Sequence, residues 1–182
     1  MAQPASLPVS LKPLFTEEQI SARVAELGQA INEHYRDTEG LIIICILKGG
    51  FMFLSDLVKH LNVPCHIEFV RLSSYGDNQK SSGQVKPVDL SLPPLVNKDI
   101  LLIEDIIDTG LTLHFFIDYL ESLHTPKSIR LAVLLDKKEA RQRPVETHFV
   151  GFEVGNQFVV GYGLDDKGFY RNLPYIACFE DV

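Results

Sequence analysis

LLIEDIIDTGLT, residues 101–112, is the stretch of the sequence that carries the most information about the fold. Its apolar start is typical of a buried strand, which is predicted to span 99–104. Three carboxylates, Glu104, Asp105 and Asp108, then follow within five positions. A buried strand rarely ends in such a group without partners for the charges. The pair Glu104 and Asp105 suits ribose hydroxyls or a hydrated Mg²⁺, which prefers oxygen ligands.

The second half of this motif is a threonine-glycine turn that opens a predicted helix over 112–123. Gly110 lets the backbone turn tightly and approach a ligand closely. The free N–H groups at the start of the helix, with the hydroxyls of Thr109 and Thr112, are predicted to cradle a phosphate. The alternative is an acidic turn that only caps the helix. The turn matches neither a Walker A loop nor a G-x-G-x-x-G dinucleotide turn.

Strands and helices alternate on both sides of this motif. Thr16 and Gln19 have the spacing of a capping box at the start of the first helix. The run 41–47, LIIICIL, is typical of a strand buried on both faces. The alternation predicts an α/β fold with a mainly parallel central sheet flanked by helices, and ligands bound beyond the carboxyl ends of the strands. The predicted helices span 17–36, 51–61 and 112–123, and the predicted strands span 41–47, 65–72, 99–104, 129–135, 148–152 and 158–162.

Three segments depart from this alternation. Residues 1–14 contain three prolines and are predicted to form an extended arm. Residues 73–98 contain two glycines and three prolines, and a connection of this length in a compact domain is usually functional or disordered. They are predicted to form a mobile flap with a brief strand near 85–90. Gly155-Asn156 is predicted to be a hairpin-type turn between the last two strands.

The composition of the chain limits its partners. Its 182 residues fit a single domain, and a net charge of −7 gives no general attraction to nucleic acid or to anionic membranes. The longest apolar run, 41–47, is too short to span a bilayer, and the N-terminus lacks the pattern of a signal peptide. Cys45, Cys65 and Cys178 lie far apart and are predicted to be buried, reduced thiols of a cytoplasmic protein.

Several motifs together resemble a known family. LLIEDIIDTGLT is similar to the phosphoribosyl pyrophosphate motif of type I phosphoribosyltransferases, and its E-D-I-I-D-T-G form resembles the hypoxanthine-guanine phosphoribosyltransferases in particular. The likeness covers about residues 40–176. It includes ILKGG (46–50), RLSSYG (71–76), LLDKK (134–138) and VGFEVGNQFVVGYGLDD…YR (150–171).

The resemblance implies the family's fold and domain organisation. The expected fold is the type I phosphoribosyltransferase fold, with a small hood over the central sheet. The whole chain, 1–182, would form one domain. The N-terminal arm and 153–182 would contribute the hood, and 73–98 would be the flexible active-site loop, with Ser74 and Tyr75 matching the family's Ser-Tyr pair.

The resemblance also implies roles for the central motif. Asp108 would be the catalytic base that accepts a ring proton from the purine. Glu104 and Asp105 would hold the ribose hydroxyls and, with Asp165, would bind Mg²⁺. The segment 109–112, which comprises Thr109, Gly110, Leu111 and Thr112, would hold the 5-phosphate. Leu111 departs from many relatives, which often have a polar or basic residue at this position.

Residues outside the central motif would complete the site. Lys48 and Gly49 resemble the pyrophosphate loop, where relatives have a non-proline cis peptide, and Arg171 would also bind pyrophosphate. Lys137 would donate to the exocyclic oxygen of a 6-oxopurine. The remaining purine-binding residues would be Phe158, which stacks on the base, Val159 and Asp165. Asp166-Lys167 departs from relatives, which often have an aromatic residue first.

The implied function is purine salvage, with phosphoribosyl pyrophosphate and hypoxanthine or guanine as substrates and Mg²⁺ as cofactor. The expected assembly is a homodimer or homotetramer, with no nucleic-acid or membrane partner. One alternative is a phosphoribosyltransferase-like regulatory protein that senses nucleotides, although the acidic charge gives it little support. A phosphohydrolase with Asp108 as nucleophile is a weaker alternative.

Overall fold

The computed structural model of the chain describes residues 10–74, 85–89 and 92–180. Six strands form the main sheet: β2 (Leu41–Leu47), β3 (Cys65–Ser74), β4 (Val85–Asp89), β5 (Asp99–Ile107), β6 (Ser128–Asp136) and β7 (Phe149–Glu153). Their order is β4-β3-β2-β5-β6-β7. All neighbours pair in parallel except β4, which runs antiparallel to β3. The predicted α/β fold with a mainly parallel sheet is confirmed.

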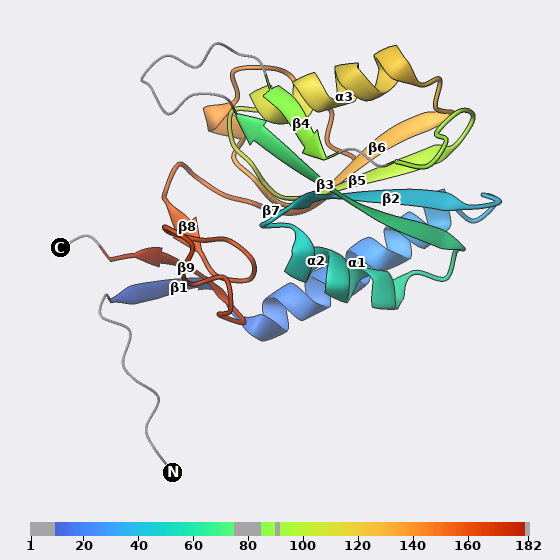
Figure 1. The fold of residues 1–182 in the computed structure, drawn as a ribbon. Coiled ribbons are helices and arrows are strands. Elements are labelled where there is room, and N and C mark those ends of the chain that lie inside the picture. Colours follow the sequence, from blue (N-terminus) through green and yellow to red (C-terminus); the bar gives the residue numbers. More distant parts are fainter. Residues whose placement is uncertain (1–9, 75–84, 90–91, 181–182) are drawn as a thin grey trace.

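Helices cover both faces of this sheet (Figure 1). α1 (Glu17–His34) and α2 (Phe51–Leu57) lie on one face, and α3 (Leu111–Leu123) lies on the other. Two short 3₁₀ turns, η1 (Val58–His60) and η2 (Lys138–Ala140), follow α2 and β6. Successive side chains of a strand point to opposite faces, so Ile43 of β2 joins the core under α1 and α2, and Ile44 joins the core under α3. This explains why the central strands are continuously apolar.

The start of α1 matches the sequence prediction. The backbone N–H of Gln19 donates to Thr16 Oγ1 at 3.3 Å, and the backbone N–H of Thr16 donates to Gln19 Oε1 at 2.9 Å, so the capping box is confirmed. The predicted second helix over 51–61 is shorter, because α2 ends at Leu57 and continues only as η1.

A second sheet joins the two ends of the chain. It consists of β1 (Leu11–Phe15), β9 (Ile176–Phe179) and β8 (Val159–Val160) in that order, with antiparallel pairing. Figure 1 shows it apart from the main sheet, beside the start of α1. Part of the predicted extended arm is therefore a strand, and β9 was not predicted. We call this sheet, with the connection 161–175, the hood.

Two predictions near the hood are wrong. The predicted strand 158–162 is shortened to β8, because Gly161 and Tyr162 have positive φ angles of 97° and 48°, which end an extended strand. Gly155-Asn156 does not form a hairpin turn between paired strands. β7 pairs with β6 in the main sheet while β8 pairs with β9, so the connection carries the chain from one sheet to the other.

The predicted flap lies only partly within the described residues. β3 extends to Ser74, and β4 supplies the brief strand expected near 85–90. Residues 75–84 and 90–91, including Tyr75, lie outside the description, so closure of the flap stays a prediction.

Two further expectations concern membranes and cysteines. Within the described ranges, no helix combines the length and apolar character needed to cross a membrane. All three cysteines are free, but only Cys45 is buried. Cys65 is exposed and Cys178 is half-buried, so the prediction of buried thiols is wrong for these two.

Candidate active site

Three neighbouring strands bring the predicted site residues to one edge of the main sheet. Lys48-Gly49 follows β2, Asp108 follows β5 and Lys137 follows β6. β5 lies between β2 and β6, and its Ile107 is paired with Asp136 at the end of β6. From β2 the chain continues to β3 on one side, and from β5 it continues to β6 on the other. Such a switch point in a parallel sheet is where ligands bind.

β5 is longer than predicted, and this places two carboxylates on the strand itself. The strand reaches Ile107 rather than ending at Glu104, so Glu104 and Asp105 lie within it, and their carboxyl groups lie close enough to interact. Glu104 lines a cavity of about 150 Å³ on the side of α3, together with Asp108 and the turn that follows. Asp105 faces the turn after β2. The other residues of that cavity are Ile106, Ile107, Thr109, Gly110, Thr112 and Leu113.

The two carboxyl groups are shielded from solvent to different effect, and Glu104 lacks a protein partner suited to its charge. Glu104 Oε2 is shielded from solvent and has no hydrogen-bond partner among the described residues. Desolvation, and then the neighbouring charge of Asp105, raise the pKa of Glu104 well above its ordinary value. Desolvation also raises the pKa of Asp105, against the opposing effects of backbone N–H donors and of Arg171. Such groups favour an external hydroxyl or cation as partner.

The threonine-glycine turn has the conformation expected of a phosphate cradle. Gly110 has a φ of 76°, a left-handed conformation that favours glycine, and α3 begins directly after it. Thr109 Oγ1 accepts from the backbone N–H of Leu111 at 3.4 Å. The carbonyl oxygen of Thr109 accepts from the backbone N–H groups of Gln142 (2.9 Å) and Arg143 (3.2 Å). The segment after β6 therefore braces this turn.

Lys137 lies beside the same turn. Its backbone N–H donates to the carbonyl oxygen of Ile107 at 3.0 Å, and its side chain is buried, with 7% of the residue exposed. Asp108 is exposed to solvent. An ammonium has three donors and no acceptor, so it suits a ligand that offers an oxygen.

A buried ion pair supports the end of β6. Asp136 is buried and pairs with Arg141, while Lys138 pairs with Glu153 at the surface. The sequence left the direction of Asp136 open and gave no signal for Arg141, because the η2 turn between them determines that they meet.

The turn after β2 lies directly against β5. The peptide bond between Leu47 and Lys48 is cis, in the segment where the resemblance predicts such a bond. A Cβ atom added to Gly49 would lie 1.5 Å from Asp105 Oδ2, so only glycine fits beside this carboxylate. The predicted pyrophosphate loop and one predicted ribose ligand are therefore in contact.

The hood brings two more predicted residues to this turn. Arg171 Nη1 donates to the carbonyl oxygen of Gly163 at 2.6 Å, and Arg171 Nη2 pairs with Asp165 Oδ1 at 2.5 Å. A Cβ atom added to Gly163 would lie 2.2 Å from the carbonyl oxygen of Gly49. Arg171, Asp165 and Gly49 are thus linked through Gly163.

The predicted base-stacking residue, Phe158, lies directly before β8 of the hood. Phe158 is exposed and stacks on Phe179, with ring centroids 6.0 Å apart, whereas Val159 is buried in β8. Among the described residues, no hydrogen bond or aromatic contact connects Phe158 with the Asp108 turn. The exposed ring is available to a flat ligand, and its role stays a prediction.

The predicted metal ligands do not form a preformed metal site. Within the residues described, no group of three or more His, Cys, Asp and Glu side chains is arranged to hold a metal ion. Glu104 and Asp105 lie on β5, whereas Asp165 lies in the hood and is paired with Arg171. Any bound cation would therefore need oxygens from a substrate or from water.

The fold and this geometry agree with comparisons to known proteins. The sequence model of the family described as phosphoribosyl transferase domain matches residues 11–167 of this chain. The chain is 46% identical over 169 residues to a hypoxanthine-guanine phosphoribosyltransferase of Bacillus subtilis, with 93% of each chain covered. It is 42% identical over 186 residues to one of Mycobacterium avium, covering 98% of this chain and 91% of that protein.

A solved structure has the same fold. The crystal structure of a hypoxanthine phosphoribosyltransferase from Staphylococcus aureus matches with a TM-score of 0.88 and 39% identity, covering 93% of this chain and 91% of that one. The resemblance and fold class predicted from the sequence are confirmed. The chain belongs to the hypoxanthine-guanine phosphoribosyltransferases, within the type I phosphoribosyltransferase family.

Proposed function

We propose that this chain is a purine-salvage enzyme that transfers the 5-phosphoribosyl group from phosphoribosyl pyrophosphate to hypoxanthine or guanine. The products are IMP or GMP and pyrophosphate. The observation that carries the proposal is the edge of the main sheet, where Lys48-Gly49, the Asp108 turn and the buried Lys137 follow three neighbouring strands. The names of the relatives point to the same reaction.

The sugar phosphate would be held by the central motif. The turn comprising Thr109, Gly110, Leu111 and Thr112 would bind the 5-phosphate with backbone N–H groups and hydroxyls, as the start of a helix favours. Glu104 and Asp105 would accept hydrogen bonds from the ribose hydroxyls. The unpartnered Glu104 Oε2 and the cavity beside it support this role.

The same carboxylates suit a divalent cation. Mg²⁺ commonly takes one or two carboxylates and completes its shell with water and substrate oxygens, so the lack of a three-residue cluster among the described residues is compatible with it. Glu104, Asp105 and Asp165 are the residues that would contribute. When bound, Mg²⁺ would neutralise charge on the pyrophosphate leaving group.

Pyrophosphate would lie between the turn after β2 and the hood. The backbone of Lys48 and Gly49 and the guanidinium of Arg171 would bind its oxygens. The close approach of Gly163 to Gly49, and the hydrogen bond from Arg171 to Gly163, support a shared site.

The purine would be recognised and deprotonated at the neighbouring turns. Lys137 would donate to the 6-oxo group, which favours hypoxanthine and guanine over adenine because an amino group cannot accept from the ammonium. Phe158 would stack on the ring, with Val159 and Asp165 at its edge. As the bond from C1 of the ribose to pyrophosphate breaks, a ring nitrogen bonds to C1, and Asp108 accepts the proton that the ring loses.

The surroundings of the site complete the proposal. Ser74 and Tyr75 would belong to a loop that closes over the substrates and excludes water. Phe51, Ile67 and Phe69 are exposed apolar residues on or near α2 and β3, which supports self-association as a homodimer or homotetramer. We also propose a cytoplasmic location, for which the three free cysteines are typical.

Replacing Asp108 tests the reaction. Asp108→Asn keeps the shape of the side chain but removes the proton acceptor, so turnover with hypoxanthine should fall by about 10²–10⁴-fold. Asp118→Asn on α3 is the matched control, because Asp118 is exposed and lies outside the site. Turnover is measured as IMP formed from phosphoribosyl pyrophosphate and Mg²⁺. Undiminished turnover of the Asp108 variant would rule out the base role.

A substrate panel separates the proposal from its alternatives. Nucleotide should form with hypoxanthine or guanine and not with adenine. Equal use of adenine would contradict the role of Lys137. A salt-dependent shift with nucleic acid, without nucleotide formation, would favour a regulatory protein.

A further inference from the structure

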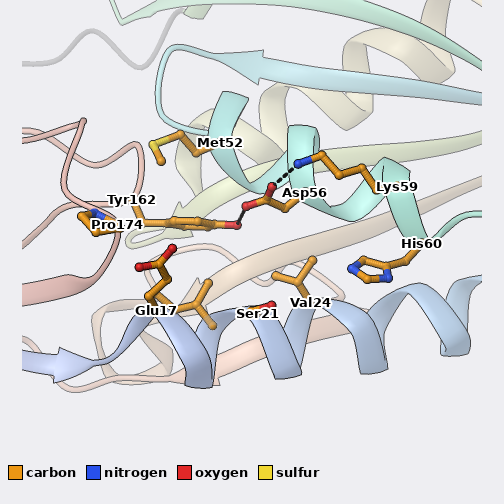
Figure 2. A pocket seen from close by; sticks show the side chains of 10 residues that line it. Glu17, Ser21, Val24, Met52, Asp56, Lys59, His60, Tyr162 and Pro174 are labelled. Carbon is orange, nitrogen blue, oxygen red and sulfur yellow. Dashed lines mark hydrogen bonds and ion pairs between the residues drawn. The ribbon is translucent and has the colours of Figure 1, made fainter.

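A hollow outside the candidate active site contains an unusual connection between the hood and α2 (Figure 2). Its volume is about 310 Å³, and it lies between α1, α2 and the hood. Tyr162 reaches into it from the hood, and its hydroxyl donates to Asp56 Oδ2 on α2 at 2.7 Å. Lys59 Nζ donates to the other oxygen of Asp56, also at 2.7 Å.

The hood end of this connection is held in a conformation that few residues adopt. Tyr162 has a φ of 48°, and it is buried with 4% exposed. Non-glycine residues with left-handed backbones persist where the surrounding structure determines them, and they cluster at functional sites. The backbone N–H of Tyr162 also donates to the carbonyl oxygen of Leu173 at 2.8 Å.

The other end of the connection leads directly to the turn after β2. α2 begins at Phe51, immediately after Gly50, and the backbone N–H of Leu54 donates to the carbonyl oxygen of Gly50 at 2.9 Å. Asp56 lies on the same short helix. Because a hydrogen-bonded helix moves as a unit, holding Asp56 also holds the turn 48–50.

The two ends meet again at the proposed pyrophosphate site. Gly163, the residue after Tyr162, lies against the carbonyl oxygen of Gly49 and accepts from Arg171 Nη1. The chain from Gly163 through Tyr162, Asp56 and α2 back to Gly49 therefore closes a ring of contacts. The Tyr162–Asp56 hydrogen bond is the side-chain link in this ring.

The charge states favour this bond near neutral pH. Burial, and then the hydrogen bond and charge of Asp56, raise the pKa of Tyr162, so its hydroxyl stays a donor. Partial burial acts to raise the pKa of Asp56, but the hydrogen bonds from Lys59 and Tyr162 outweigh it and lower that pKa. The facing groups that line the hollow from α1 and η1 are Glu17, Ser21, Lys59 and His60.

We propose that Tyr162 and Asp56 are a positioning pair, which sets the spacing between the Lys48-Gly49 turn and Arg171 and thereby tunes affinity for the pyrophosphate group. Neither residue touches the reacting atoms. The inference rests on the proposed function, because it concerns one of the substrates of that reaction.

Removing the hydroxyl should act on one substrate only. In Tyr162→Phe the KM for phosphoribosyl pyrophosphate should rise about three- to tenfold, the range expected for the loss of one hydrogen bond. The KM for hypoxanthine should change by less than about twofold. Asp56→Ala should show the same selective rise, and the double variant should add little, because both changes break the same contact. Asp56→Asn retains an acceptor oxygen and should recover most of the wild-type value.

A control and a binding measurement keep the test decisive. Ser21→Ala alters the same hollow without touching the pair, and its kinetic constants should match the wild type. Titration calorimetry with Mg²⁺ and pyrophosphate measures affinity without turnover, so it tests the pair even if IMP formation, and hence the proposed function, fails. Loss of thermal stability with unchanged pyrophosphate affinity would overturn the inference. An equal rise in both KM values, or no pyrophosphate binding by the wild type, would also overturn it.

Discussion

The two ends of β5 both carry carboxylates away from full solvent exposure, but their surroundings are opposite. At the amino end, Asp99 is buried and fully partnered. It accepts from Thr38 Oγ1 at 3.0 Å, from Lys127 Nζ at 2.9 Å and from Ser128 Oγ at 2.7 Å. Partial desolvation acts to raise its pKa, but these donors outweigh that effect and lower the pKa.

At the carboxyl end of β5, the effects that raise the pKa of a carboxyl group outweigh those that lower it. Glu104 has a shielded oxygen without a partner among the described residues, and its pKa is raised by desolvation and by Asp105. A carboxylate with donors around it stabilises the folded chain, whereas one left without them costs stability. From this comparison we infer that the amino end of β5 serves the fold, and we propose that the carboxyl end binds a ligand.

The largest expected effect is on activity, at the carboxyl end. Asp105→Asn keeps the shape beside Gly49 but removes the charge that would hold ribose or Mg²⁺. We expect kcat/KM for phosphoribosyl pyrophosphate to fall about 100-fold, which corresponds to about 2.7 kcal/mol. Steady-state kinetics measure this, with the melting temperature as a check that the fold is intact. If kcat/KM stays within threefold of the wild type, the two ends do not differ as proposed.

The second effect is on stability, at the amino end. Asp99→Asn leaves Lys127 and the two hydroxyls without a charged acceptor, so the free energy of unfolding should fall by about 1–3 kcal/mol. kcat/KM should be unchanged. Urea denaturation measures the loss, and Glu121→Gln, an exposed position on α3, is the control. The folded-state pKa of Asp99 is lowered, so this deficit should be full at neutral pH and should shrink as the pH falls below about 4.

The smallest expected effect is a gain in stability rather than a loss. Glu104→Gln removes a carboxyl whose pKa is raised on folding, so the variant should be more stable than the wild type at neutral pH, on the order of 1 kcal/mol, while losing activity. A raised pKa means that wild-type stability falls as the pH rises from about 4.5 through the folded-state pKa. The advantage of the variant should therefore grow with pH in that window. If the stability of the Glu104→Gln variant relative to the wild type increased as the pH falls, the comparison of the two ends of β5 would be contradicted.

The regular elements around the site were predictable because their signals are local. An apolar run of seven residues specifies β2, and a capping box specifies the start of α1. The motif 101–112 combines a strand, acidic residues, a glycine with positive φ and the start of a helix, all within twelve positions. Each of these patterns depends on neighbours in the chain, and each lies close to its predicted position.

The hood was less predictable because its contacts join distant residues. β9 is four residues long and is stabilised by pairing with β1, more than 160 positions earlier, so its own sequence carries little signal. The shortening of the strand predicted at 158–162 depends on the left-handed backbone at Tyr162. A tyrosine does not predict a left-handed backbone, because tyrosine favours strands.

The sequence by itself determined the α/β fold, the order of its main elements and the family. Hydrophobic periodicity, the capping box and the motif 101–112 all depend on residues that are close together in the chain. Only the tertiary structure decided that β5 extends past Glu104 and Asp105 to Ile107, that Asp136 pairs with Arg141, and that Tyr162 bonds to Asp56. These outcomes depend on where strands end and on which surfaces meet, and such contacts are set by packing between segments far apart in the chain.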